Sequence, residues 1–288
     1  MTEGLDPPLL RHLAVVALAE DRTDHDITTL ALVPPEQAGR GAIIAKAEGV
    51  LAGLPLAAAV FAAVDGSLVW RAHSEDGQTL SPGDVVAGVE GPLASLLRGE
   101  RVALNYLTHL SGVATAAAAV VRALDGTGCR LRDTRKTIPG LRALQKYAVR
   151  TGGGTNHRLD LADGVLIKDN HLAALRARGL GVGDAVRLAR EANPGMRIEI
   201  EMTTVEEAGQ ALAAGADELL LDNMPPEMMR EVVALAAACD PRPALEASGG
   251  ITLENARAVA ETGVDYISMG AITHSAPALD LSLEVEAE

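Results

Sequence analysis

Short apolar stretches alternate with amphipathic stretches from about residue 114 to near the end of the chain. Each apolar stretch has the length of a strand, and the stretch after it carries apolar residues at helical spacing. The predicted strands lie at 129–135, 163–170, 197–202, 218–223, 243–250 and 264–271. Their starts are roughly twenty to thirty-five residues apart, enough for one strand, one helix and loops. This alternation predicts an α/β barrel around a parallel sheet, and a doubly wound open sheet is the alternative.

Two helix starts in this series carry local signals. Thr204 and Glu207 have the spacing of a capping box at the start of the helix that follows 197–202. Pro225 and Pro226 follow the strand at 218–223, and proline is tolerated in the first turn of a helix because the N–H that it lacks would have no partner there. Both signals support the same order of strand and helix.

The pattern before residue 113 is different. Residues 40–53 alternate like a strand, 54–64 form a helix candidate, and 67–91 are a β segment interrupted by glycine and proline. Residues 101–124 are rich in alanine and predict one helix or two, leading into the barrel. We therefore expect a separate α+β domain at residues 1–112, followed by the barrel at 113–272.

Composition and charge narrow the functional classes. The 288 residues are 48% hydrophobic but only 2% aromatic, and the formal net charge is −14. Nucleic acid is disfavoured as the main partner because basic stripes with interleaved aromatic residues are lacking. The opening MTEGLDPPLL lacks the basic-then-apolar order of a signal peptide, and we find no apolar run of about 18 to 20 residues. We expect a cytoplasmic protein without a membrane segment.

Basic residues are nevertheless concentrated between residues 130 and 158. Around the stretch DTRKT at 133–137 the cations are Arg130, Arg132, Arg135, Lys136, Arg142, Lys146, Arg150 and Arg158. Asp133 is the one acid among these cations, and His157 lies beside Arg158. A solvated helix face would explain such a cluster. A site for a polyanionic small molecule would explain it as well, because arginine and lysine match carboxylate and phosphate oxygens.

Polar residues at the carboxyl ends of the predicted strands favour the second explanation. Side chains at these ends face the active site of a barrel. The strand-end residues are Arg135 and Lys136; Lys168, Asp169 and Asn170; Glu201; Asp222 and Asn223; Ser248, Gly249 and Gly250; and Gly270. One such residue alone would be a helix cap or a turn residue more often than a functional one. Six consecutive strands that end this way predict a functional site.

The strand-end residues also divide by chemistry. The cations Arg135, Lys136, Arg158 and Lys168, with His157, suit carboxylates and phosphates, and the TGGG loop at 151–154 allows His157 and Arg158 to reach an anion. The acids Glu201 and Asp222 suit sugar hydroxyls or Mg²⁺. The glycines of SGG and MGA allow backbone N–H groups to approach a phosphate ahead of a helix.

These motifs resemble the quinolinate phosphoribosyltransferase family. The matching stretches are ERVALNYL, DTRKTIPGLR, KYAVRTGGGTNHRLDLADGVLIKDNH, IEIE, LLLDN, EASGGI and GVDYISMGAITHSAPALDLSL, which follow one another through most of residues 99–282. The opening EDRTDHDITT is also similar, although His25 stands where the family has glycine. The resemblance implies an open-faced N-terminal α/β sandwich domain, joined by the C-terminal tail at 273–288. It also implies an incomplete α/β barrel of the type II phosphoribosyltransferase kind, and a homodimer or larger assembly whose subunits share the active site.

The resemblance further implies the reaction and its residues. Quinolinate and 5-phosphoribosyl 1-diphosphate would give nicotinate mononucleotide, diphosphate and CO₂ in de novo NAD synthesis, with Mg²⁺ as cofactor. The implied substrate-binding residues are Arg101, Thr134, Arg135, Lys136, His157, Arg158 and Lys168, with Ser248, Gly249, Gly250, Met269, Gly270 and Ala271 for phosphate. Glu201 and Asp222 would hold the ribose hydroxyls and a metal-linked water, and together with Lys136 they are the implied catalytic residues.

Three alternatives stay open at this point. Another phosphoribosyltransferase of the same architecture could use nicotinate with ATP, or could belong to the paralogues associated with molybdenum transport; the clustered cations favour a dicarboxylate. A non-catalytic sensor of phosphorylated metabolites would need only the glycine-rich ends, and Glu201 and Asp222 argue against it. A phosphosugar lyase would need a Schiff-base lysine, for which Lys168 is the candidate.

Overall fold

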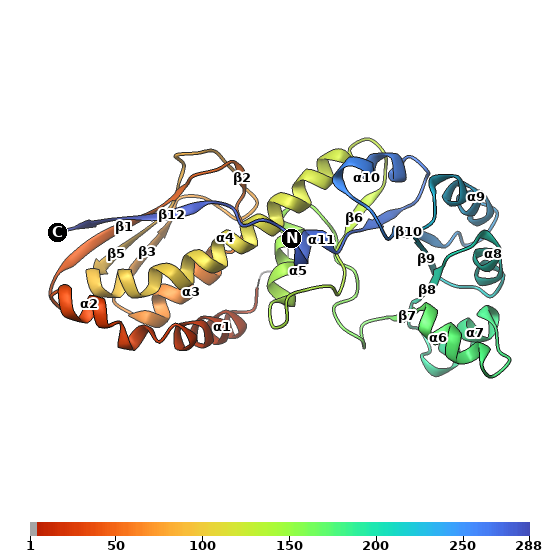
Figure 1. Cartoon of the computed structure of the whole chain (residues 1–288), viewed down its shortest axis with the longest axis horizontal. Helices are drawn as coiled ribbons and strands as arrows, with labels where there is room; N and C mark the ends of the chain where they lie inside the picture. The colour runs from red at the N-terminus through yellow and green to blue at the C-terminus, as the bar shows by residue number, and fades with distance from the viewer. Residues whose placement is uncertain (1–4) are drawn as a thin grey trace. The chain divides into compact units, whose positions relative to one another are not determined.

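The computed structural model describes residues 5–288 and divides into two compact units (Figure 1). The first unit contains the chain up to Ala118, together with Ile138–Gly153 and Ile272–Glu288. The second contains Ala119–Thr137 and Gly154–Ala271. The C-terminal tail thus groups with the N-terminal part, as the resemblance implies. Residues 138–153, which the alternating pattern assigned to the barrel domain at 113–272, group with the first unit. Residues 1–4 of the opening stretch lie outside the described residues.

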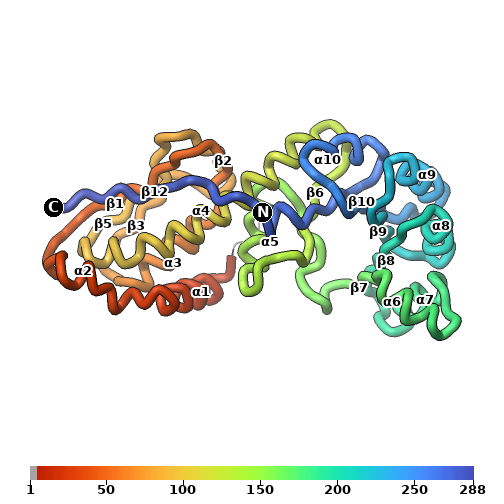
Figure 2. The backbone as a smooth tube through the Cα atoms, in the orientation of Figure 1, coloured from red at the N-terminus to blue at the C-terminus, as the bar shows by residue number. Residues whose placement is uncertain are grey.

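The first unit is built on an antiparallel sheet with strand order β12-β1-β5-β3. Its strands are β1 (Ala38–Ala45), β3 (Val69–Ala72), β5 (Val85–Pro92) and β12 (Leu281–Ala287), and β2 (Gly49–Val50) pairs separately with β4 (Thr79–Leu80). Strand β12 pairs with β1 along its length, from Leu281 beside Ala45 to Ala287 beside Gly39 (Figure 2). Through this pairing the C-terminal tail forms an edge strand of the sheet of the first unit.

Helices complete the first unit. They are α1 (Pro7–Glu20), α2 (Ile27–Leu32), α3 (Leu54–Val64), α4 (Leu93–Ala123) and α5 (Arg142–Thr151), with the 3₁₀ turn η1 (Thr23–His25). The last five residues of α4, from Ala119, belong to the second unit. Helix α3 has the predicted bounds, and its Leu56, Val60 and Phe61 are buried in the core. The sequence analysis missed α1 and α2. Helix α2 is capped by Asp26, whose carboxylate accepts from the N–H groups of Thr28 and Thr29, so the helix start is intact despite His25.

Helix α4 is one continuous helix that begins before the predicted 101–124. It is the one helix of the described residues that is long and apolar enough to cross a membrane by length and composition. However, 56% of its most apolar window is buried inside the structure, as in the core helix of a globular domain. Polar residues such as Asn105, Thr108 and Ser111 interrupt the apolar run of this helix, so the expectation that no uninterrupted apolar run reaches this length is not contradicted.

The second unit is built on a six-stranded parallel sheet with strand order β6-β11-β10-β9-β8-β7. Its strands are β6 (Arg130–Arg132), β7 (Val165–Ile167), β8 (Ile198–Met202), β9 (Glu218–Asp222), β10 (Ala244–Ser248) and β11 (Tyr266–Ser268). The helices that follow β7 to β10 are α6 (Asp169–Arg176), α7 (Val182–Ala192), α8 (Val205–Ala213), α9 (Pro226–Ala236) and α10 (Leu253–Ala260), and α11 (Ala271–His274) follows β11. Thr204 caps α8 by accepting from the N–H of Glu207 at 3.2 Å, as predicted.

The barrel is incomplete. Within residues 5–288, the contact that bridges the edge of β6 is a single pair, Arg132 with Thr155, from the segment ahead of β7. All six strands are shorter than predicted, most of all β6, β7 and β11, which end at Arg132, Ile167 and Ser268. Arg135 and Lys136 therefore lie in the loop after β6, and Lys168 is the N-cap residue of α6. All three residues still follow the carboxyl end of a strand, which is where the sequence analysis placed them.

Candidate active site

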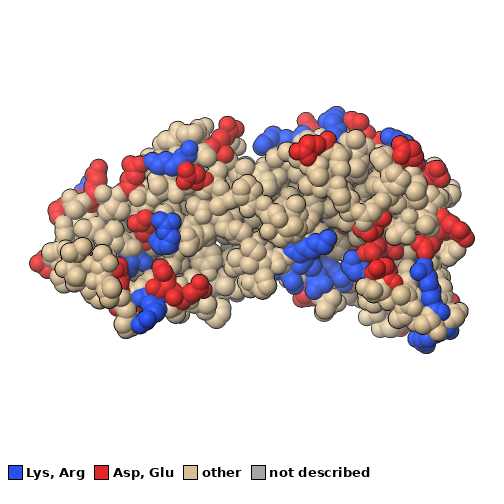
Figure 3. All heavy atoms as spheres, in the orientation of Figure 1, with Lys and Arg blue, Asp and Glu red and all other residues tan. Residues whose placement is uncertain are grey.

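A cavity of about 270 Å³ opens at the carboxyl ends of the parallel strands. The predicted residues that line it are Thr134, Arg135, Lys136, His157, Arg158, Lys168, Glu201, Asp222 and Ser248. The other lining residues are Leu166, Leu220, Glu246 and Ser268. On the face shown in Figure 3, a concentration of Lys and Arg lies next to a concentration of Asp and Glu, whereas the two kinds are interspersed elsewhere. Six of the twelve residues that were selected as strand-end residues thus line one cavity.

Asp133 holds the two loops that carry most of the cations. Its side chain is fully buried and accepts hydrogen bonds from the backbone N–H of His157, at 2.9 Å, and from the side-chain amide of Asn156. In the loop after β6, the Thr134 hydroxyl accepts from the N–H of Lys136 at 3.0 Å and tightens the turn. The single acid within the basic stretch therefore fixes the positions of the cations around it.

Arg158 lines the cavity together with a second arginine, Arg135. Its side chain donates to the carbonyl oxygen of Gly164 at 3.0 Å. Burial, and then the positive charge of Arg135, lower the pKa of Arg158 below its ordinary value. Arg158 nevertheless stays charged at neutral pH, because arginine deprotonates only far above it. Two neighbouring guanidinium groups in one cavity are best stabilised by an anion between them, and a carboxylate matches their geometry.

The acids of the cavity lie on adjacent strands. Glu201 in β8 accepts from the Lys168 ammonium at 2.7 Å, and its side chain is only 10% exposed. Asp222 ends β9 and accepts from the side-chain amide of Asn223 at 2.7 Å. Since these carboxylates line one wall of the same cavity, they can accept hydrogen bonds from sugar hydroxyls or hold a hydrated Mg²⁺.

The glycine pair after β10 approaches this wall closely. Gly249 has φ of +86°, and a Cβ built on it would lie 2.4 Å from the side-chain oxygen of Asn223. Gly250 has φ of +62°, but its nearest neighbour, the same oxygen, would be 3.9 Å away. The backbone N–H of Asn223 in turn donates to the carbonyl of Ser248 at 2.8 Å. Glycine at 249 is thus required both by backbone conformation and by space.

Gly249→Ala is expected to lower the free energy of unfolding by about 1–3 kcal/mol, because it combines a strained φ with a clash. The displaced Asn223 side chain would also lose its bond to Asp222. Gly250→Ala is the matched control and should cost less, since it carries the φ strain without the clash. Urea unfolding of both variants measures the difference. Equal losses would show that the contact with Asn223 is unimportant.

The remaining predicted residues do not line the cavity. Met269 has a buried side chain, so any phosphate contact there would come from its backbone. Gly270 lies between the end of β11 at Ser268 and Ala271, the first residue of α11. Arg101 lies in α4 of the first unit, with a side chain that is 64% exposed and 3.7 Å from the Glu100 carboxylate.

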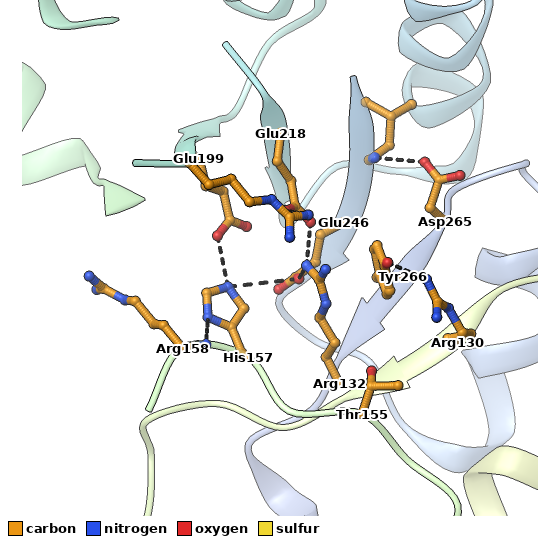
Figure 4. Close-up of polar contacts among 12 residues, drawn as sticks. Arg130, Arg132, Thr155, His157, Arg158, Glu199, Glu218, Glu246, Asp265 and Tyr266 are labelled. Carbon is orange, nitrogen blue, oxygen red and sulfur yellow. Dashed lines mark hydrogen bonds and ion pairs between the residues drawn. The ribbon is translucent and has the colours of Figure 1, made fainter. Parts of the chain in front are cut away.

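A layer of buried charged side chains, which was not predicted from the sequence, lies one layer below the strand ends, and its Glu246 reaches the cavity. This buried ionic layer consists of Arg132, Glu199, Glu218 and Glu246. One Arg132 nitrogen donates to Glu246 at 2.6 Å and also to Glu218, and its guanidinium lies 3.3 Å from the centroid of the Tyr266 ring. Figure 4 shows the arrangement. The sequence does contain a signal for this layer. In the apolar strands RIEIEM and PALEAS, Glu199 and Glu246 each lie two residues before a predicted site residue, and therefore one layer lower on the same face of the sheet.

His157 links this layer to the cavity. Its Nε2 lies 2.7 Å from Glu199 and 3.8 Å from Glu246. These atoms are close enough to one another for the three residues to be considered as metal ligands. However, Glu246 is already paired with Arg132, whose positive charge disfavours a cation at this position. Glu246 is also fully buried, whereas Glu201 pairs with the partly exposed Lys168 and lines the cavity together with Asp222, so Glu201 and Asp222 are the better candidates for a metal.

Comparison with known proteins identifies the family. The family model described as quinolinate phosphoribosyl transferase, C-terminal domain, matches residues 113–284. The model of the N-terminal domain matches residues 26–111. The chain belongs to the quinolinate phosphoribosyl transferase family. The resemblance drawn from the strand-end motifs is thereby confirmed.

Relatives within this family match nearly the whole chain. It is 45% identical over 267 residues to the probable nicotinate-nucleotide pyrophosphorylase [carboxylating] of Bacillus subtilis, covering 92% of this chain and 90% of that protein. It is 42% identical to the human nicotinate-nucleotide pyrophosphorylase [carboxylating], covering 97% and 94%. The crystal structure of NadC from Streptococcus pyogenes superposes with a TM-score of 0.93 at 38% identity, covering 99% of both chains. The predicted two-domain α/β fold with an incomplete barrel is confirmed.

Proposed function

We propose that this quinolinate phosphoribosyl transferase moves the phosphoribosyl group of 5-phosphoribosyl 1-diphosphate to quinolinate, with decarboxylation, in NAD biosynthesis. The products are nicotinate mononucleotide, diphosphate and CO₂. The observation that carries this function is the composition of one cavity, in which cations from two loops and from the start of α6 line the same space as the carboxylates of Glu201 and Asp222 on adjacent strands. Both substrates are polyanions, and one also carries a ribose, so both kinds of group are needed.

The cations suit the two carboxylates of quinolinate. Arg135 and Arg158 form the crowded guanidinium pair, and Lys136 and Lys168 line the same cavity. A dicarboxylate offsets this concentration of positive charge better than a monocarboxylate does. The phosphoribosyl group then contacts the acids through its ribose and the backbone at Ser248–Gly250 through its phosphate, because glycine permits close approach there.

The reaction requires little covalent chemistry from the protein. The quinolinate ring nitrogen forms a bond to C1 of the ribose as the bond from C1 to the diphosphate oxygen breaks. Glu201 and Asp222 support the ribose ring as it gains positive charge. The quaternised nitrogen then stabilises the electron pair left on the adjacent carbon when the 2-carboxylate departs as CO₂, and that carbon takes a proton from solvent. Lys136 is the cation assigned to the developing negative charge at this carbon.

We propose Mg²⁺ as the cofactor, held through water by Glu201 and Asp222. Mg²⁺ prefers oxygen ligands and retains several waters, and these two carboxylates face one cavity. When bound, it neutralises charge on the diphosphate. We expect EDTA to abolish turnover and excess MgCl₂ to restore it, measured as diphosphate release. Full activity after exhaustive chelation would rule out the metal.

The function is tested with quinolinate labelled in its 2-carboxylate. Purified protein with 5-phosphoribosyl 1-diphosphate should release labelled CO₂ and form one nicotinate mononucleotide for each CO₂. Nicotinate with ATP, in a parallel reaction, should give no product. Turnover of nicotinate instead would favour the related phosphoribosyltransferases, and trapping of substrate on Lys168 by borohydride would favour a Schiff-base lyase.

We also propose a homodimer that acts in the cytoplasm. Apolar side chains are exposed along α1 and α2, among them Val15, Ile27, Leu30 and Leu32, with Ile27 at 81%. Exposed apolar residues grouped on short helices are typical of a subunit interface. Arg101 is assigned to quinolinate binding in the cavity of the partner subunit. The substrates are water-soluble metabolites, which agrees with a cytoplasmic place of action.

A further inference from the structure

The ring of His157 is held on both sides. Its Nε2 lies 2.7 Å from Glu199, and its Nδ1 accepts the backbone N–H of Arg158 at 2.8 Å. A ring nitrogen accepts a hydrogen bond only while it carries no hydrogen. The proton of the neutral ring therefore lies on Nε2, where it is donated to Glu199. This hydrogen-bond pattern selects one tautomer of His157.

Arg158 depends on this tautomer for its position. Its backbone N–H ends on Nδ1 of His157, and its guanidinium is anchored by the carbonyl of Gly164. In Figure 4 the Arg158 side chain extends away from the buried ionic layer, whereas the His157 ring turns its Nε2 toward Glu199 and Glu246. With both ring nitrogens occupied, His157 is better suited to orient Arg158 than to bind substrate itself.

We propose that Glu199 is a positioning residue for the substrate dicarboxylate: it fixes His157 as the Nε2–H tautomer, so that Nδ1 holds the Arg158 backbone and aims the guanidinium into the cavity. This inference rests on the proposed function and deepens it. It assigns a role to a residue outside the predicted site, and it explains why a carboxylate lies in the interior of β8, where a barrel normally places an apolar residue.

The groups around His157 predict a pH dependence of this positioning. Glu199 faces it from β8, Glu246 from β10 and Arg132 from β6, and Asp133 accepts its backbone N–H. Burial alone would lower the pKa of His157, but the hydrogen bond and charge of Glu199, with the charge of Glu246, raise it overall. Below that pKa Nδ1 carries a hydrogen, so Arg158 loses its acceptor. The KM for quinolinate should rise as the pH falls through this range.

The pKa of Glu246 is raised as well, so the effect of its protonation must be separated from that of His157. Burial, and then the charge of Glu199, raise the pKa of Glu246 to about 7. Arg132 and His157 oppose this rise. Glu246 touches His157 only at 3.8 Å and makes its short contact to Arg132, so its protonation leaves the bond between His157 and Glu199 in place.

Two substitutions at position 199 test the proposal. Glu199→Leu removes the acceptor and should raise the KM for quinolinate at least ~10-fold, with the KM for 5-phosphoribosyl 1-diphosphate within about 3-fold. Glu199→Gln retains an acceptor but not the charge. At about pH 8.5 it should restore the KM for quinolinate to within about 3-fold of wild type, and the rise in KM should begin at a lower pH.

Glu218→Gln is the matched control. Glu218 belongs to the same buried ionic layer and pairs with Arg132 and Arg197, but the structure gives it no bond to His157 among the described residues. Its substitution should lower the melting temperature and leave the pH at which the quinolinate KM rises unchanged. If Glu199→Leu raises both KM values equally, or if Glu218→Gln shifts the pH profile as Glu199→Gln does, the layer has only a structural role.

A measurement without substrate separates this inference from the function. In protein labelled with ¹⁵N-histidine, the His157 signals, assigned with His157→Asn, should show hydrogen on Nε2 and none on Nδ1 at about pH 8.5, and Glu199→Leu should abolish this preference. Hydrogen on Nδ1 in the wild type would overturn the inference even if quinolinate is turned over. Absence of quinolinate turnover with the expected tautomer would instead overturn the proposed function.

Discussion

Arg158→Ala is expected to lower kcat/KM for quinolinate by at least ~100-fold, a loss of a few kcal/mol. The structure holds Arg158 beside Arg135 although burial and the second charge both disfavour its charged form. A substrate carboxylate placed between the two guanidinium groups offsets this repulsion, and it loses one side of its binding site when Arg158 is removed. Initial rates of CO₂ release over a range of quinolinate concentrations measure the effect.

The effect should depend on the shape of the group as well as on its charge. Arg158→Lys keeps the charge but loses the planar fork, so we expect only a partial rescue, with kcat/KM about 10-fold below wild type. The surface control is Arg187→Ala in α7, which removes an exposed arginine paired with Asp184 and Glu191 and should leave the rate unchanged. Near wild-type turnover by Arg158→Ala would remove the guanidinium pair from substrate binding.

The strand-end residues were predictable because a parallel sheet brings the ends of its strands to one edge. Lys168 and Asp222 could be placed in one site from their positions after apolar stretches, and both line the cavity. The lengths of the strands were less predictable. Backbone pairing stops at Arg132 and Ile167, where the chain turns toward the site, and apolar content alone does not mark that point.

The buried ionic layer was missed because burial was assumed to exclude charge. Glu199 and Glu246 lie in short apolar strands, and alternation assigns them to the barrel interior, where aliphatic residues are the rule. Their charges are tolerated because Arg132 and His157 lie between them, and those residues are far away in sequence. No local pattern contains that pairing.

Two helices of the first unit were not predicted from the sequence for a different reason. Helices α1 and α2 carry apolar residues on exposed faces. The spacing of their apolar residues therefore does not mark a face that packs on the core of one chain. Val15 and Leu30 are exposed in the single chain, and a second subunit packed against them would bury them. The exposed apolar faces of α1 and α2 thus account both for the weak helical pattern in the sequence and for the proposed dimer.

A mixture of two inactive variants is expected to recover activity if subunits share their sites. Arg101→Ala and Lys136→Ala should each lower kcat/KM for quinolinate by at least ~100-fold, since each removes a cation assigned to the substrate. Lys136 lines the cavity of its own chain, whereas Arg101 lies on the exposed surface of α4. Arg101 is therefore assigned to the cavity of the partner subunit.

In a hybrid dimer with one copy of each variant, one of the two sites carries both substitutions and the other carries neither. Random exchange at equal concentrations makes half of the dimers hybrid, so activity should return to about a quarter of wild type. Subunit exchange is confirmed by mass spectrometry of chains that carry different tags. The control is a mixture of Lys136→Ala and Lys168→Ala. Both positions line the cavity of one chain, so every site of that hybrid dimer stays defective. If exchange is complete and the first mixture gains no more activity than the control, each site is formed by one chain, and Arg101 acts elsewhere.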